Sequence, residues 1–86
     1  MAHFAQLDSS NNVTNVVSVV NSILLDATGT EHEALGIAFL QQTFGADTTW
    51  VQTSYSGRIR GRYAGIGMVY DPTSNVFTVP EPDLAL

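Results

Sequence analysis

The stretch "TEHEALGIAFLQQTFG", residues 30–45, carries the clearest local structural signal in this chain of 86 residues. Thr30 stands three residues before Glu33, which is the pattern of a capping box at a helix start, and Gly45 is a typical helix C-cap. Apolar residues recur at helical spacing in two rows, one of Ile37, Leu40 and Phe44 and one of Leu35 and Phe39. The stretch therefore predicts a helix over residues 31–44. Because its apolar arc is wide, we expect one side to pack on a sheet and a second side to contact something else.

The segments before this helix predict an N-terminal β-hairpin. "HFAQLD" (3–8) alternates around Phe4 and reads as a short strand, and "VTNVVSVVN" (13–21) is rich in β-branched residues. The turn-forming cluster "DSSNN" (8–12) between them predicts a five-residue loop. Valines stand on both faces of the second strand, so we expect that strand to be central in a sheet or covered by a second layer.

The segments after the helix predict three further strands. "TTWVQTSY" (48–55) alternates, and "SG" (56–57) suits a two-residue hairpin turn. "RIRGRYAGIGMVY" (58–70) reads as the next strand, with glycines inside it. "DPTSN" (71–75) then forms a tight turn before a short last strand, "VFTV" (76–79).

Together these elements predict an α+β domain over residues 1–79. We expect an antiparallel sheet of about five strands with one helix packed on a face, in the order β-β-α-β-β-β. Residues 80–86, "PEPDLAL", predict an extended, Pro-rich C-terminal tail, because proline cannot donate a ladder hydrogen bond. Such a segment loses little entropy on docking, so Leu84 and Leu86 are candidate anchors on a partner, with a frayed terminus as the alternative.

Composition limits the classes of function. The net charge of −5 disfavours a general nucleic-acid binder, and the absence of cysteine excludes disulfides and thiolate metal sites. "MAHFAQLD" lacks the features of a signal peptide, and no apolar run reaches the ~20 residues of a membrane helix. We therefore expect a soluble chain made in a cytosol, without a membrane partner. Its surface must be mostly uncharged and polar, which favours a protein that works in an assembly.

All the positive side chains of the chain stand in "SGRIRGRY" (56–63), namely Arg58, Arg60 and Arg62. On a strand this spacing places them in one row on one face, and such a row of guanidinium groups suits carboxylates or phosphates. Phosphate is the least favoured partner, because eight carboxylates oppose it. The row could pair with a protein partner or with acidic residues of its own chain, such as Glu31, Glu33 or Asp47. The open alternatives are thus the chain's own helix start and a neighbouring subunit.

The remaining motifs do not favour catalysis. "YAGIG" (63–67) lacks the strand–turn–helix context of a dinucleotide site, so its glycines indicate bulges or a close backbone approach. His3 and His32 have no partner at metal-ligand spacing. Glu31 and Glu33 suit a helix start, and no nucleophile elbow such as G-x-S-x-G occurs. We expect no enzyme activity, no metal and no cofactor.

The chain resembles a family of small proteins encoded by tailed phages of marine cyanobacteria. The resemblance lies in "MAHFAQLD", in "GIAFLQQTFGADTTWVQTSYSGRIRGRYAGIGMVYD" and in "FTVPEP", which together cover most of the chain. Members of that family often have cysteine where Leu40 stands here. The resemblance implies a phage gene product and a component of the virion, and it brings no catalytic residues with it.

The expected function is therefore that of a non-enzymatic virion structural protein, made in the host cytoplasm. It would decorate or cement the capsid or associate with the tail through protein–protein contacts, with other virion proteins or further copies of itself as partners. The alternative is a regulatory or host-takeover binding module that acts inside the infected cell as a dimer. A nucleic-acid binder is a third and weaker interpretation.

Overall fold

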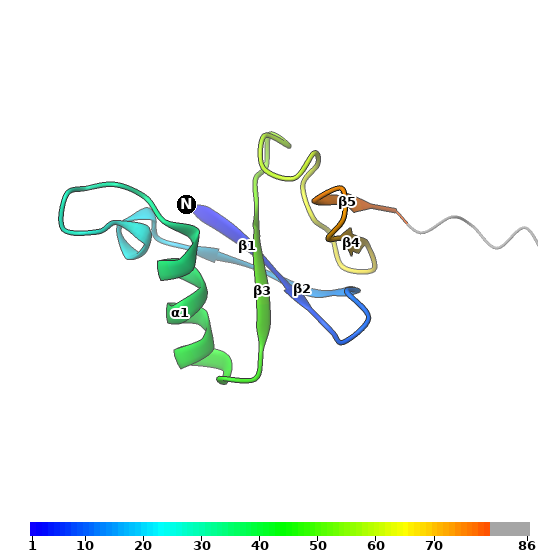
Figure 1. Ribbon diagram of the computed structural model, residues 1–86, viewed down its shortest axis with the longest axis horizontal. Coiled ribbons are helices and arrows are strands. Elements are labelled where there is room, and N and C mark those ends of the chain that lie inside the picture. The colour runs from blue at the N-terminus through cyan, green and yellow to red at the C-terminus, as the bar shows by residue number, and fades with distance from the viewer. Residues whose placement is uncertain (80–86) are drawn as a thin grey trace, which may run out of the picture.

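The computed structural model describes residues 1–79, and these residues form an α+β fold in the order β-β-α-β-β-β (Figure 1). The elements are β1 (Ala2–Leu7), β2 (Val13–Val19), the 3-10 turn η1 (Asn21–Leu24), α1 (Glu33–Phe44), β3 (Thr49–Thr53), β4 (Val69–Asp71) and β5 (Val76–Thr78). The predicted fold class and element order are confirmed. The predicted tail at 80–86, with Leu84 and Leu86, lies outside the described residues.

The strands form two antiparallel sheets, where one sheet of about five strands was expected. The larger sheet has the order β2-β1-β3, and the smaller one pairs β4 with β5. A single bridge between Asn12 and Val69 joins them, supported by a hydrogen bond from the Val13 amide to the Met68 carbonyl at 2.7 Å. After this bridge the β4–β5 hairpin folds over a face of the larger sheet, so the pairing does not continue.

The N-terminal hairpin follows the prediction. Residues 8–12 connect β1 and β2, and the Asp8 carboxylate accepts hydrogen bonds from the amides of Ser10 and Asn12, both at 2.9 Å. β1 is the central strand of the sheet, whereas β2 lies at an edge and is covered on both faces. The second-layer alternative for the valine-rich strand is therefore correct.

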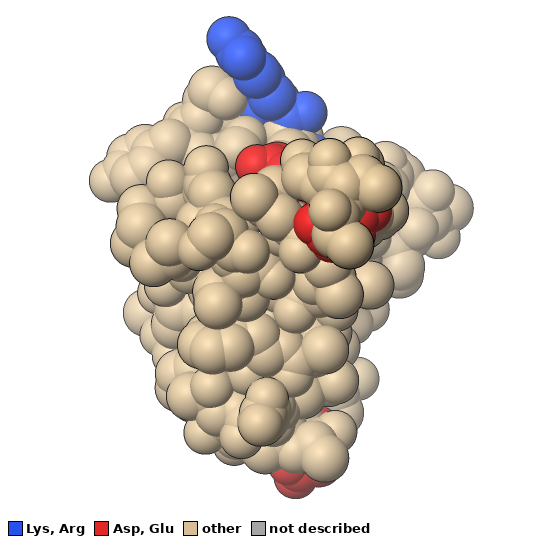
Figure 2. Space-filling model, turned by 90° about the vertical axis from the view of Figure 1, so that its left-hand side faces the viewer, with Lys and Arg blue, Asp and Glu red and all other residues tan. Residues whose placement is uncertain are grey.

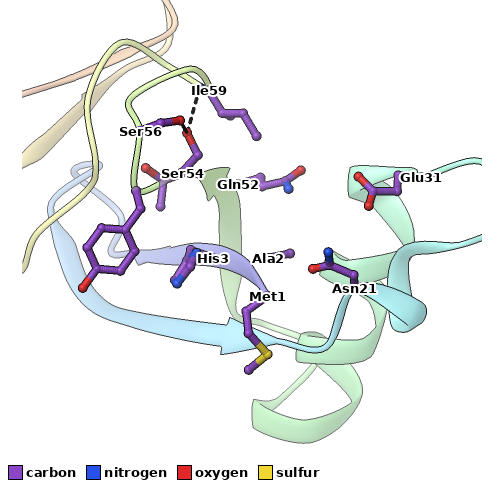
Figure 3. Close-up of a pocket in the computed structure, with 11 residues that line it drawn as sticks. Met1, Ala2, His3, Asn21, Glu31, Gln52, Ser54, Ser56 and Ile59 are labelled. Atoms are coloured by element: carbon purple, nitrogen blue, oxygen red, sulfur yellow. Dashed lines mark hydrogen bonds between the residues drawn. The ribbon is translucent and has the colours of Figure 1, made fainter.

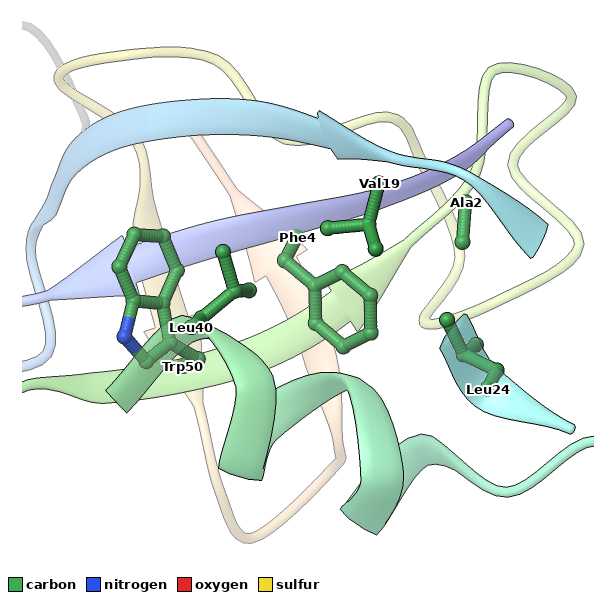
Figure 4. Packing of buried hydrophobic residues seen from close by; sticks show 6 residues of the cluster. All are labelled: Ala2, Phe4, Val19, Leu24, Leu40 and Trp50. Atoms are coloured by element: carbon green, nitrogen blue, oxygen red, sulfur yellow. The ribbon is translucent and has the colours of Figure 1, made fainter. Parts of the chain in front are cut away.

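Two apolar cores lie on opposite faces of the larger sheet, and Figure 1 shows α1 and the β4–β5 hairpin on its two sides. Phe4 is fully buried in the core under α1, and its ring packs against Gly36 so closely that a methyl group there would collide with it (Figure 4). The rest of this core consists of Ala2, Val19, Leu24, Leu40 and Trp50. The second core, under the hairpin, consists of Ala5, Leu7, Val13, Ala64 and Phe77. The larger sheet is thus the middle layer of three.

The start of α1 differs from the prediction, because Thr30 and Glu33 do not form a capping box. The helix begins at Glu33 with His32 as N-cap, and no side chain caps it. The Thr30 amide instead donates to the Asp26 carboxylate at 3.1 Å, within a turn that Asp26 organises. The helix end is as predicted: Gly45 is the C-cap, with a φ of 131° that favours glycine.

Candidate functional site

Residues 58–70 do not form the predicted strand, and Ser56-Gly57 does not join two strands of a hairpin. The chain runs irregularly from Ser54 to Met68, and only Val69–Asp71 is extended as β4. Arg60 has a φ of 59° and Gly61 a φ of 82°, which are left-handed values that a strand cannot contain. The expected row of three arginines on one strand face is therefore wrong.

Arg60 is paired within its own chain, to the start of α1. Its guanidinium group lies 3.1 Å from a Glu33 carboxylate oxygen, donates to the Gln52 carbonyl at 2.7 Å and donates to the Asn75 side chain at 3.0 Å. The Arg60 side chain is only 14% exposed. Burial opposes its charge, but hydrogen bonding by Tyr70 and Glu33 outweighs this, and the pKa of Arg60 lies above its ordinary value. Of the two partners left open for the arginines, the helix start is the one that Arg60 uses.

The same side chains close the outer edge of β3. Glu33 accepts a hydrogen bond from the Gln52 amide at 2.9 Å, while Arg60 donates to the carbonyl of that residue. Gln52 stands opposite Phe4 of β1, and its two backbone groups point away from β1 to the free side of the strand. Gln41 adds a third contact by donating to the Thr48 carbonyl at 3.0 Å. We call Glu33, Arg60 and Gln41 the edge clip, because they take the place of a further strand.

Arg58 and Arg62 are exposed, and no carboxylate of residues 1–79 forms an ion pair with either. In the view of Figure 2, arginine atoms protrude at one end of the molecule, while most of the visible face is uncharged. The arginine segment thus divides into one structural cation and two that remain accessible.

An aromatic cluster of His3, Tyr55 and Tyr63 lies beside this segment, and sequence reasoning missed it. The two tyrosine rings stack with centroids 4.5 Å apart and an interplanar angle of 10°. His3 is nearly perpendicular to both, at 5.2 and 5.6 Å, so its ring lies against their edges. Tyr55 is 76% exposed, which leaves its second face open. The pairing of His3 with Thr53 brings Tyr55 beside His3, and the Thr53 hydroxyl holds Tyr63 there by bonding to the Arg62 carbonyl and the Ala64 amide. Neither contact can be read from the sequence.

A pocket of about 280 Å³ opens next to this cluster, between the start of β1, the end of β3 and the loop that follows (Figure 3). Its walls are mixed, with polar groups from Asn21, Glu31 and Gln52 and apolar atoms from Met1 and Ile59. Its serine hydroxyls are used in the loop itself: Ser54 accepts from the Ile59 amide at 3.1 Å and lies 3.4 Å from the Ser56 hydroxyl. Such walls suit an apolar group that also carries hydrogen-bonding atoms.

The outer side of α1 is apolar and uncovered by residues 1–79. Leu35 and Phe39 are each 38% exposed and stand one turn apart, and Phe44 is 49% exposed beside Trp50. We call Leu35 and Phe39 the outer helix face; Phe44 stands in the inner row with Ile37 and Leu40. The sequence predicted that α1 would contact something on a second side, and within the described residues that side has no cover.

The two histidines have separate surroundings. His32 lies 2.7 Å from the Asp26 carboxylate, and hydrogen bonds from Thr28, His32 and Thr30 hold the pKa of Asp26 well below its usual range. His3 belongs to the aromatic cluster. Within residues 1–79 no group of three or more His, Cys, Asp or Glu side chains is placed to hold a metal ion, and no helix there is long and apolar enough to cross a membrane.

No protein-family model matches the chain, and no curated protein or solved structure matches it.

Proposed function

We propose that this protein is a non-enzymatic structural component of a phage particle, which decorates or cements the capsid or associates with the tail through protein–protein contacts. The outer helix face is the observation that carries the proposal. It presents Leu35 and Phe39 to solvent on one side of a regular helix. Apolar surface that remains exposed on a folded domain is typical of a contact site.

The energy of this contact suits a repeated structural role. Leu35 and Phe39 are each 38% exposed, so covering them contributes roughly 1 kcal/mol each. That is too little for one tight complex, because association itself costs several kcal/mol. It is sufficient where many copies bind one lattice and neighbouring contacts reinforce each other.

The open ring of Tyr55 offers a second contact point, since tyrosine is enriched where proteins meet. The resemblance to cyanophage proteins supports the phage particle as the place where these contacts form. A regulatory module inside the infected cell would use the same surfaces on a soluble host protein, so the location of the protein distinguishes the two functions.

The test is to purify particles and measure the protein by mass spectrometry, and then to bind variants to particles that lack it. Leu35→Ser/Phe39→Ser should lose most of its binding. Thr73→Ser, an exposed polar position in the turn between β4 and β5, should bind as the parent does. Particles that contain none of the protein, or a double variant that binds them fully, would contradict the proposal.

A further inference from the structure

The free edge of β2 differs in chemistry from the β3 edge of the same sheet. β2 is the outer strand of the larger sheet, with β1 between it and β3 (Figure 4). The β4 hairpin covers this edge only at its start, through the bonds of Asn11 and Val13 to residues 67–70. Beyond Val13, no other backbone segment of residues 1–79 hydrogen-bonds to this side of the strand. A ladder of backbone groups is therefore available from Thr14 onward.

The register identifies which groups these are. Because Gln52 directs its backbone away from β1, its neighbour Phe4 bonds to β2 instead, opposite Val17. The backbone N–H and C=O groups of Val17 therefore point toward β1. Those of its neighbours Val16 and Ser18 point outward, to the free edge. The Val16 amide confirms this assignment, because its acceptor is the adjacent Asn15 side chain at 3.0 Å and not a strand.

The side chains of β2 contain none of the devices that usually protect an edge. Natural edges carry lysine, proline or inward charges that prevent pairing with another chain. Residues 9–25 include no Asp, Glu, Lys or Arg, and β2 itself is mostly Val, Thr, Ser and Asn. The register shift between Gln6 and Leu7, a bulge, lies at the end of β2 that β4 already covers. β-branched residues without charge favour strand pairing.

We propose that β2 pairs antiparallel with β2 of a second copy of this chain, about a two-fold axis at Val17. Val16 of each copy then exchanges both backbone hydrogen bonds with Ser18 of the other, and the two Val17 side chains meet as a non-hydrogen-bonded pair. Charge is compatible with this partner: the chain has a net charge of −5, but residues 9–25 carry no charge, so two copies that meet at β2 bring no carboxylates face to face along this edge. The Asn15 side chain yields its bond to the Val16 amide when the second strand arrives. This pairing does not depend on the particle-binding role proposed above.

The absence of cysteine in the chain allows a direct geometric test. In the proposed register the Val17 Cα atoms lie about 4.5 Å apart, within disulfide range, while the Ser18 Cα atoms lie about 7–8 Å apart and outside it. Under mild oxidation Val17→Cys should therefore form a disulfide-linked dimer, and Ser18→Cys should not. Equal cross-linking of the two variants would overturn the register.

Self-association is measured by light scattering over a concentration series. The parent should be a dimer, and Val16→Pro, which removes an outward amide, should raise the dissociation constant about tenfold or more. Ser18→Lys should do the same, and Thr49→Lys, the same change of charge on β3, should not. Circular dichroism checks that each variant is folded. A parent that stays monomeric would overturn the proposal and leave residues 80–86 as the rival occupant of the edge, and a dimer that survives both β2 substitutions would also overturn it.

Discussion

The two edges of the three-stranded sheet are closed in different ways. At β3, Glu33 and Arg60 come from elements far away in the sequence and bond to both backbone groups of Gln52. At β2, the only comparable side-chain contact within residues 1–79 is local, where the Val16 amide donates to the side chain of its neighbour Asn15. Ion-paired side chains held by tertiary packing block an edge, whereas an incoming strand can displace the single side-chain carboxamide of Asn15. The two outer strands of one sheet therefore differ in whether they can accept a partner.

The largest expected effect comes from opening the closed edge. Arg60→Ala removes three hydrogen bonds and leaves the Gln52 carbonyl and one oxygen of the Glu33 carboxylate without their partner, so the free energy of unfolding should fall by about 2–3 kcal/mol. Urea denaturation measures it. Arg58→Ala, an exposed arginine two residues away, is the matched control and should change little. Equal losses in the two variants would show that the edge clip has no special role.

A smaller effect is expected when only the charge of the edge clip is changed. Glu33→Gln keeps a carbonyl oxygen that can accept from the Gln52 amide, but it removes the charge that pairs with Arg60. The free energy of unfolding should fall by about 1 kcal/mol, and high salt should reduce the difference from the parent. A loss as large as that of Arg60→Ala would mean that charge, and not backbone pairing, decides the closure.

Acid should weaken the turns at residues 8–12 and 71–75. Hydrogen bonds from Asn12 and Ser10 lower the pKa of Asp8, and hydrogen bonds from Ser74 and Thr73 lower the pKa of Asp71, each from 3.8. A carboxyl group with a lowered folded-state pKa stabilises the fold above its unfolded value and loses this contribution as the pH falls through the folded value. The melting temperature should therefore fall as the pH drops below about 4. Asp8→Asn, which keeps an acceptor and cannot titrate, should show less of this dependence; an unchanged profile would contradict the role of Asp8.

The smallest effect on stability is expected at the open edge itself. Ser18 is exposed and its backbone groups on the outer side bond to nothing else in residues 1–79, so Ser18→Lys should change the free energy of unfolding by less than about 0.5 kcal/mol at concentrations where the chain is monomeric. Its effect should appear in self-association alone. A large destabilisation would show that this edge is already structural within one chain.

Local signals explain which predictions were correct. The body of α1 and its end at Gly45 follow from apolar periodicity and from a backbone conformation that glycine favours. The loop at 8–12 follows from a dense cluster of turn formers between two β-rich runs. Each of these elements is decided by residues within a few positions of one another.

The incorrect predictions concern side chains with two competing partners. Thr30 and Glu33 fit a capping box, but Asp26 binds the Thr30 amide and Arg60 binds Glu33. The alternation of Arg58, Arg60 and Arg62 fits a strand, but Arg60 and Gly61 adopt left-handed conformations that turn the chain. Sequence spacing alone could not rank these options, because Arg60 reaches Glu33 from 27 residues away and Asp26 competes for Thr30 from only four residues away.

The sequence by itself determined the element order, the helix, the first hairpin and the fact that every cation lies in one short segment. Only the tertiary structure decided that Arg60 reaches a carboxylate 27 residues earlier, that one sheet becomes two, and which edge stays open. The physical reason is the range of the forces involved. Backbone propensity and turn chemistry act between neighbours, whereas ion pairing and edge closure need the packed core to bring distant residues within about 3 Å of each other.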